Sequence, residues 1–278
     1  MHNPLPPLVG ADDLAVRLRS AGPAVIDLRP ADEFRSGHIR GAVRSDYAVD
    51  GWRTARGGVP GYLPDPEKLS ALLGSLGLRP GRPAVIVPPG LSPGDFSIAA
   101  RVYWTLRSAG HGTVSILDGG MADWSGAGHP VEAGPEQPRV PDAYPVQSNP
   151  ALRAELPDVA AAVADRSATL VDSRGPKSFR GEEKSAQAAR AGRLPGAINL
   201  EGAGAFDAGR GRLRPRAELE TLFGPVPPGP AVAFCNTGQA AATNWFVLSE
   251  ILGRPGIRLY DGSMSEWTAD PARPVETG

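Results

Sequence analysis

The chain carries one sequence pattern twice. The first copy reads Ala24-Val25-Ile26-Asp27-Leu28-Arg29 with Phe34 after it, and the second reads Thr169-Leu170-Val171-Asp172-Ser173-Arg174 with Phe179 after it. Three further pairs follow in the same order: 37–43 with 192–198, 83–87 with 230–234, and 117–120 with 260–263. The paired blocks lie between 143 and 155 residues apart, which is far longer than a solenoid repeat. The pattern therefore predicts a duplicated domain.

The length of the chain agrees with a duplication. At roughly 150 residues per domain, 278 residues suggest two domains. The stretch from Gly134 to Pro150 is rich in proline and polar residues and has no apolar periodicity, as is typical of an extended linker. We expect an N-terminal domain over residues 8–133 and a C-terminal domain over residues 149–275.

Each half alternates short apolar runs with helical patterns. Strands are predicted around Val25-Ile26 and Leu170-Val171, and over 84–87, 231–234, 114–117 and 257–260. Apolar residues at helical spacing predict helices over Ser97–Ser108 and Ala240–Leu252. Strands that alternate with helices favour an α/β fold in which helices cover a central parallel sheet. Ligands of such sheets bind at the carboxyl ends of the strands.

Charge and composition exclude several classes of function. With 29 basic and 30 acidic residues, the net charge of −1 argues against nucleic acid or acidic membranes as partners. No stretch approaches the roughly 18 apolar residues of a transmembrane helix. The N-terminus lacks the features of a signal peptide, so we expect a cytoplasmic protein. The possibility that a signal peptide was removed before residue 1 stays open. With one cysteine, four histidines and no Cys/His cluster, we expect no disulfide, metal or cofactor.

The one cysteine, Cys235, follows the apolar run 231–234 directly. It begins a short polar loop with a glycine, Gly238, and the next predicted helix follows. Loop N–H groups and the positive end of the helix both favour a thiolate, the nucleophilic form. This placement favours a reactive cysteine over a buried thiol that only fills space. The predicted anion-binding residues are the next five: Asn236, Thr237, Gly238, Gln239 and Ala240.

These motifs together resemble a tandem-domain rhodanese, a sulfurtransferase. The resemblance rests on the paired Asp-x-Arg and Gly-Ala segments, the loop from Cys235 to Gly238, and the Asp-Gly turns before Trp124 and Trp267. It implies two rhodanese-like α/β domains. It also implies that Cys235 takes a sulfane sulfur from a small donor and passes it, as a persulfide, to a thiophilic acceptor.

The first half has no equivalent nucleophile. Aligning 83–87 with 230–234 places Pro88 opposite Cys235, and proline offers neither a thiol nor an amide donor. We therefore expect the N-terminal domain to be catalytically silent. The pairs Asp27–Arg29 and Asp172–Arg174 are expected to be structural.

The donor is less clear from the sequence than the reaction. Cysteine phosphatases share the rhodanese fold, but they need an arginine that closes the loop, and none follows Cys235 here. Family members commonly have an arginine at the position of Ser178, so Arg180 is the candidate substrate contact, with Lys177, Lys184 and Arg190 nearby. We favour thiosulfate as the donor, with 3-mercaptopyruvate as the alternative.

The sequence leaves several acceptors of the sulfur and one competing class of function. Cyanide or a thiol fits as acceptor, and a thioredoxin-like protein fits as a partner. The rival interpretation is a non-enzymatic sulfur carrier or interaction protein that kept the fold. The retained Cys235 argues against it, because the first half lost its equivalent residue.

Overall fold

The computed structural model describes residues 5–20, 22–135 and 142–278. Residues 136–141, part of the expected linker, lie outside the described residues. The chain divides into two compact units. Unit 1 comprises Met1–Trp52, Pro64–Ser148 and Asp207–Leu213, and unit 2 comprises Arg53–Leu63, Asn149–Phe206 and Arg214–Gly278.

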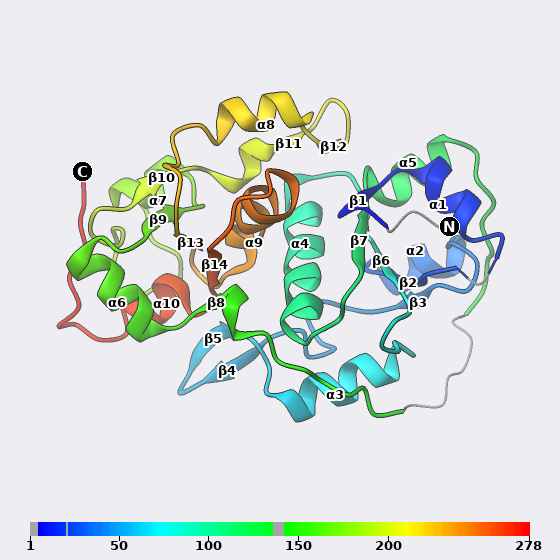
Figure 1. Ribbon diagram of the computed structural model, residues 1–278, viewed down its shortest axis with the longest axis horizontal. Helices are drawn as coiled ribbons and strands as arrows, with labels where there is room; N and C mark the ends of the chain where they lie inside the picture. The colour runs from blue at the N-terminus through cyan, green and yellow to red at the C-terminus, as the bar shows by residue number, and fades with distance from the viewer. Residues whose placement is uncertain (1–4, 21, 136–141) are drawn as a thin grey trace. The chain divides into compact units, whose positions relative to one another are not determined.

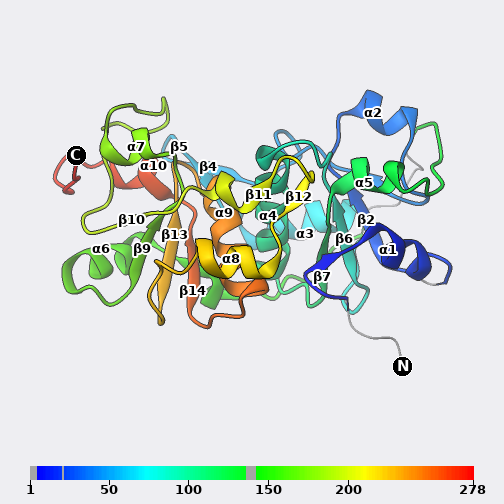
Figure 2. The ribbon, with the colours of Figure 1, turned by 90° about the horizontal axis from the view of Figure 1, so that it is seen from above.

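Unit 1 is built on a five-stranded parallel sheet of order β1-β7-β6-β2-β3. Its strands are β1 (Leu8–Val9), β2 (Ala24–Asp27), β3 (Val43–Arg44), β6 (Ala84–Val87) and β7 (Val114–Leu117). Its helices are α1 (Ala11–Arg17), α2 (Ala31–Ser36), α3 (Pro66–Ser75), α4 (Pro93–Ser108) and α5 (Gly120–Gly126). In Figures 1 and 2, α4 lies on one face of this sheet and α1 and α5 lie on the other.

Unit 2 repeats this plan with the sheet order β10-β9-β13-β14-β8, again parallel throughout. Its strands are β8 (Arg153–Ala154), β9 (Thr169–Asp172), β10 (Ile198–Asn199), β13 (Ala231–Phe234) and β14 (Ile257–Tyr260). Its helices are α6 (Leu156–Asp165), α7 (Pro176–Arg180), α8 (Arg216–Leu222), α9 (Gln239–Phe246) and α10 (Ser263–Trp267). Short 3-10 turns cover Pro150–Leu152 and Gly202–Ala205. Figures 1 and 2 show α9 on one face of β13 and α6 on the other.

The central strands are buried on both faces, which explains their continuous apolar sequence. In unit 1, Val25 and Val85 pack with Leu14 of α1 and Trp124 of α5. In unit 2, Leu170, Val232 and Phe234 pack with Trp267 of α10. The predicted strands and the α/β class are confirmed.

The two long helices differ in detail from their prediction. Helix α4 begins at Pro93 rather than Ser97, because Ser92 and Asp95 form a capping box one turn earlier. Helix α9 ends at Phe246, and the chain continues through Leu252 by way of a π-helical turn over Val247–Ile251. Within the described residues, no helix is long and apolar enough to cross a membrane.

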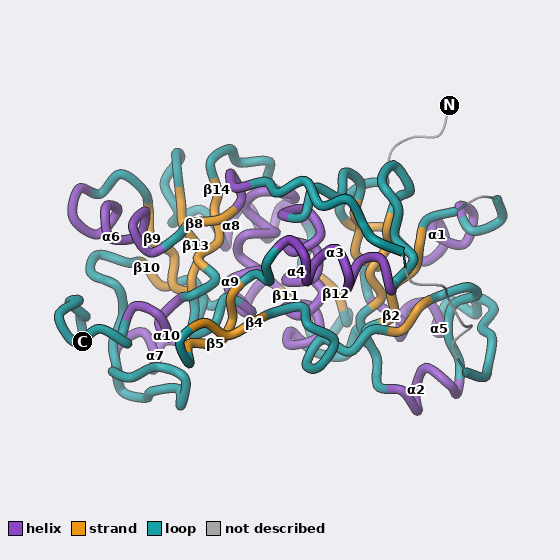
Figure 3. Tube along the Cα trace, turned by 90° about the horizontal axis from the view of Figure 1, so that it is seen from below, coloured by secondary structure: helices purple, strands orange, loops and turns teal. Residues whose placement is uncertain are grey.

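Two hairpins were not predicted, and each contributes residues from one half of the sequence to the compact unit formed mainly by the other half. The strands β4 (Thr54–Arg56) and β5 (Val59–Tyr62) form an antiparallel pair within Arg53–Leu63, the part of the first half that belongs to unit 2. Figure 3 shows this pair outside the five-stranded sheet. The strands β11 (Phe206–Asp207) and β12 (Arg212–Leu213) form the second pair, and its residues Asp207–Leu213 belong to unit 1.

Candidate active site

Cys235 directly follows β13, a strand flanked on both sides by parallel strands. Its neighbours β9 and β14 bring Asp172 and Tyr260 to the same edge of the sheet. The thiol is buried, with 3% of the residue exposed. Helix α9 begins four residues later at Gln239, after Gly238 has turned the chain with a φ of +75°. The predicted strand, loop and helix around Cys235 are all present.

A short segment at the start of α10 supports the beginning of this loop. The Cys235 N–H donates to Ser263 Oγ at 3.1 Å, and the Met264 N–H donates to the Cys235 carbonyl at 3.1 Å. Both the N–H and the hydroxyl of Ser265 donate to the Asn236 carbonyl, at 3.1 Å and 2.7 Å. Cys235 and Asn236 are therefore held through their backbone, which leaves the thiol side chain outside this set of contacts.

Ser263 is a contact of Cys235 that the sequence analysis missed. It adopts a φ of +51°, a conformation that is costly for a residue with a side chain. Its hydroxyl donates to the Tyr260 carbonyl at 2.7 Å while it accepts from Cys235. The matching residue of unit 1 is Gly120, with a φ of +59°. The signal in the sequence was the Asp-Gly-Ser variant of an Asp-Gly-Gly turn.

A second missed residue, Asn244, connects α9 with the sheet. Its side-chain amide donates to Ser173 Oγ at 2.8 Å and to the Leu200 carbonyl at 2.7 Å, and the residue is fully buried. A buried amide of this kind costs free energy unless it is hydrogen-bonded, so these bonds fix α9 against the ends of β9 and β10. The signal was an asparagine directly before the apolar residues Trp245, Phe246 and Val247.

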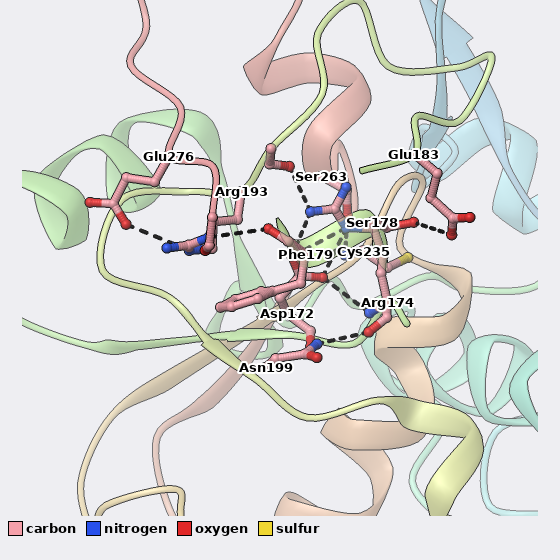
Figure 4. A network of polar contacts seen from close by, with 12 residues as sticks. Asp172, Arg174, Ser178, Phe179, Glu183, Arg193, Asn199, Cys235, Ser263 and Glu276 are labelled. Carbon is pink, nitrogen blue, oxygen red and sulfur yellow. Dashed lines mark hydrogen bonds and ion pairs between the residues drawn. The ribbon is translucent and has the colours of Figure 1, made fainter. Parts of the chain in front are cut away.

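Asp172 and Arg174 form the structural pair that the sequence predicted. The Arg174 guanidinium donates to both carboxylate oxygens of Asp172, with the shortest distance at 2.6 Å, and also to the Gly192 carbonyl at 2.8 Å. Figure 4 shows this network below Cys235. Asp27 and Arg29 make the same bidentate pair in unit 1, with Gly37 as the carbonyl partner. Both arginines are thus bound to the scaffold.

Ser178, at the position where the resemblance to rhodaneses implies an arginine, lies beside an acidic residue. It is 9% exposed, and its hydroxyl donates to Glu183 Oε1 at 2.9 Å. Figure 4 draws this hydrogen bond in the same close view as Cys235. The local charge is therefore negative rather than positive at this pair.

Arg180, the predicted substrate contact, forms an exposed ion pair with Glu182 at 2.5 Å. The hydrogen bond with Glu182 raises the pKa of Arg180, and the same bond lowers the pKa of Glu182. The structure does not bring this guanidinium together with the Cys235 loop. The role of Arg180 in donor binding stays a prediction.

The other basic residues of this segment have scaffold contacts or face solvent. Lys184 donates to the Ala188 carbonyl at 2.7 Å, and Arg190 donates to the carbonyls of Asp270 and Arg273. Lys177 is exposed. Lys184 and Arg190 are therefore held by backbone carbonyls of unit 2.

Pro88 occupies the place of Cys235 in unit 1. It follows β6 directly, and its carbonyl accepts the Met121 N–H at 2.9 Å. The Cys235 carbonyl accepts the Met264 N–H in the same way. No group of three or more His, Cys, Asp or Glu side chains that could hold a metal ion is found among the described residues.

Comparisons with known proteins agree with this geometry. The rhodanese-like domain family matches twice, over residues 10–127 and 155–270. The chain is 35% identical to a probable 3-mercaptopyruvate sulfurtransferase from Pseudomonas aeruginosa, over 98% of each chain. It is 32% identical to a thiosulfate sulfurtransferase from Corynebacterium glutamicum, over 98% of this chain and 90% of the relative.

A solved structure shows the same fold. The crystal structure of SseA from Escherichia coli, described as a 3-mercaptopyruvate sulfotransferase with the rhodanese fold, aligns with a TM-score of 0.79. It is 27% identical in sequence, and the alignment covers 93% of this chain and 99% of SseA. The chain therefore belongs to the rhodanese family and is a sulfurtransferase with two rhodanese-like domains.

Proposed function

We propose that Cys235 is the nucleophile and that it takes its sulfur from thiosulfate. One observation carries the proposal: the only cysteine of the chain lies between β13 and α9, in a loop closed by Gly238 in the left-handed conformation. An anion at this position lies near the positive end of a helix and near successive backbone N–H groups. We assign the anion-binding role to the backbone of residues 236–240.

The proposed reaction has two steps. The Cys235 thiolate attacks the sulfane sulfur of thiosulfate, the S–S bond of thiosulfate breaks, and sulfite leaves with the electron pair. The resulting persulfide, Cys–S–S⁻, keeps one negative charge. Cyanide or a thiolate then attacks the outer sulfur, and the Cys235 thiolate is released. The loop amides stabilise the cysteine anion at both ends of the cycle without reorganisation.

Unit 1 is proposed to be catalytically silent. Proline at position 88 has no nucleophilic atom and no N–H group. The equivalence of Pro88 and Cys235, supported by their matching carbonyl contacts, leaves one reactive centre in the chain.

3-Mercaptopyruvate is the second candidate donor, and the Ser178–Glu183 pair favours it. Thiosulfate is a dianion, and a carboxylate in place of the customary arginine disfavours a second negative charge. 3-Mercaptopyruvate carries one carboxylate, and the 35% identical relative is named for this donor. With it, the C–S bond breaks and the electron pair leaves on the carbon of pyruvate, which takes up a proton.

The proposed acceptor is a thiol, and the proposed setting is the cytoplasm. Thiols are kept reduced there, so low-molecular-weight thiols and thioredoxin-like proteins are available to take the persulfide sulfur. Cyanide serves as the acceptor in the assay.

The test is a parallel assay of both donors with cyanide, with thiocyanate as the measured product. Wild type is expected to turn over thiosulfate, and Cys235→Ser is expected to lose roughly 10³-fold or more in kcat. Equal turnover by wild type and Cys235→Ser overturns the assignment. If only 3-mercaptopyruvate is turned over, Cys235 remains the proposed nucleophile and 3-mercaptopyruvate becomes the proposed donor.

Intact mass separates the enzyme from a sulfur carrier. A gain of one sulfur after thiosulfate treatment, followed by its loss on addition of cyanide, supports catalysis. A gain without turnover indicates a carrier. No gain with either donor indicates that the fold serves another purpose.

A further inference from the structure

The β4–β5 hairpin, which comes from the first half of the chain, approaches the Cys235 loop within unit 2. The closest approach is at Gly61 of β5, whose φ is +103°. A Cβ atom placed on Gly61 lies 2.6 Å from the carbonyl oxygen of Thr237 and 3.0 Å from its Cβ. Real Cβ atoms do not come this close to a carbonyl oxygen, so only glycine fits here.

The contact fixes one peptide of the loop. In a trans peptide the carbonyl and the following N–H point in opposite directions. Because the Thr237 carbonyl is turned toward Gly61, the Gly238 N–H is turned away from the hairpin. If the Thr237–Gly238 peptide rotated, a carbonyl oxygen would replace an N–H donor on the side away from β5. An anion on that side would then be repelled by the carbonyl oxygen instead of being stabilised by the N–H group.

The two residues that follow Gly61 anchor the hairpin. The Leu63 N–H donates to Asp261 Oδ2 at 2.6 Å, and Asp261 is itself paired with Arg153 at 3.0 Å. Tyr62 is 6% exposed, and burial together with a hydrogen bond to Glu266 raises the pKa of its hydroxyl, which stays a neutral donor. These contacts hold the end of β5 next to the segment from Asp261 to Glu266.

The same segment that anchors the hairpin also supports the cysteine. Asp261 and Glu266 hold Leu63 and Tyr62, and the residues between them include Ser263, which accepts the Cys235 N–H. The hairpin, the start of α10 and the Cys235 loop are thus connected through one short stretch of chain.

Unit 1 contains the same arrangement without a nucleophile. A Cβ atom on Gly211, whose φ is +65°, lies 3.1 Å from the carbonyl oxygen of Gly90, in the loop that follows Pro88. A hydrogen bond from the Leu213 backbone to Asp118 corresponds to that from Leu63 to Asp261. The duplication therefore supplies a matched control for a substitution at Gly61.

We propose that Gly61 is a positioning residue for sulfur transfer: it holds the Thr237–Gly238 peptide in the orientation that presents the Gly238 N–H to the sulfur anion of Cys235. This inference rests on the proposed role of Cys235. It gives the hairpin from the catalytically silent half of the chain a direct part in the chemistry of the other half.

The test compares Gly61→Ala with Gly211→Ala in the full chain. Both substitutions add one methyl group at a positive φ, but only the first meets the reactive loop. We expect Gly61→Ala to lower kcat by roughly 10–100-fold with little change in KM, less than the roughly 10²–10³-fold loss on removing an anion-binding donor outright, because the N–H is displaced and not removed. Gly211→Ala keeps a kcat within about twofold of wild type. The thermal unfolding midpoint of each variant shows whether it is folded.

A second variant and a second readout keep the test decisive. Tyr62→Phe removes the hydroxyl that binds Glu266 without a steric clash, and we expect a smaller fall in kcat of about 2–5-fold. The second readout is the rate of Cys235 alkylation by iodoacetamide at fixed pH. We expect this rate to fall most in Gly61→Ala and less in Tyr62→Phe. This rate needs no sulfur donor, so it remains informative if wild type turns over neither thiosulfate nor 3-mercaptopyruvate.

Two results overturn the proposal. The first is a wild-type kcat and a wild-type alkylation rate in folded Gly61→Ala. The second is an equal loss in Gly61→Ala and Gly211→Ala, which indicates general destabilisation. Absence of turnover in wild type overturns the proposed sulfur transfer instead, and the alkylation rates then decide the role of Gly61 alone.

Discussion

The backbone N–H of Cys235 donates to the hydroxyl of Ser263, a residue held at a φ of +51°. Both residues are buried, and the same hydroxyl donates to the Tyr260 carbonyl. A strained residue at the start of α10 thus helps to fix the backbone that carries the thiol. Strain of this kind persists only where the surrounding contacts maintain it.

Replacing Ser263 should therefore affect the reaction more than the fold. Ser263→Gly removes the acceptor of the Cys235 N–H but accepts the positive φ, as Gly120 does in unit 1. We expect kcat/KM to fall roughly tenfold in Ser263→Gly and in Ser263→Ala. The free energy of unfolding should fall by about 1–3 kcal/mol in Ser263→Ala, from the unpaired buried N–H, and by less in the glycine variant. An unchanged kcat/KM in Ser263→Gly contradicts the role of this hydrogen bond.

Breaking the pair of Asp172 and Arg174 should destabilise unit 2 strongly. Both side chains are at most 5% exposed, so Arg174→Leu leaves a buried carboxylate without its partner. We expect a loss of about 3–5 kcal/mol in the free energy of unfolding, measured with urea. The exposed pair of Arg17 and Asp13 is the control, and Arg17→Leu should cost less than about 1 kcal/mol. A similar small loss in both variants would show that the buried pair is dispensable.

The choice of donor should respond to the charge of Glu183. Glu183→Gln keeps a hydrogen-bond acceptor for Ser178 and removes one negative charge, so KM for thiosulfate should fall about 2–5-fold. KM for 3-mercaptopyruvate should change less, because that donor has a single carboxylate. The matched control is Glu182→Gln, which releases Arg180 from its ion pair. If this control alone lowers KM for thiosulfate, Arg180 is the donor contact and Glu183 is not.

Stability in acid should depend on His111 of unit 1. Burial lowers the pKa of this histidine below 6.5; a hydrogen bond with the Arg82 backbone acts in the opposite direction. Because the unfolded chain binds the proton more readily than the folded chain, the free energy of unfolding should fall as pH drops through the unfolded pKa, and level off below the folded pKa.

The measurement is the urea midpoint of wild type and His111→Phe at about pH 7.5 and about pH 5.5. His111 also contacts the Tyr144 hydroxyl at 3.0 Å, so the variant can be less stable at both pH values. Only the difference between the two pH values reports the titration, and it should be smaller in His111→Phe. An equal difference in both proteins rules out His111 as the source.

The sequence by itself determined the duplicated α/β plan, the central strands, the position of Cys235 and the pairs Asp27–Arg29 and Asp172–Arg174. These features are local: each depends on periodicity, on a strand followed by a loop, or on residues two positions apart. A buried parallel strand needs a continuous apolar run, and the residue after it must reach the carboxyl edge of the sheet.

Only the tertiary structure decided which segments contact the Cys235 loop. Ser263 lies 28 residues from Cys235 along the chain, and Leu63 lies 198 residues from Asp261. The periodicity of a sequence does not show which distant segments come into contact. The strands β4 and β5 are also short, and β5 contains Pro60 and Gly61, residues that weaken a strand prediction. Gly61 looks like an ordinary turn glycine in the sequence, and its close contact with the Thr237 carbonyl exists only because folding brings a segment of the first half against a loop of the second.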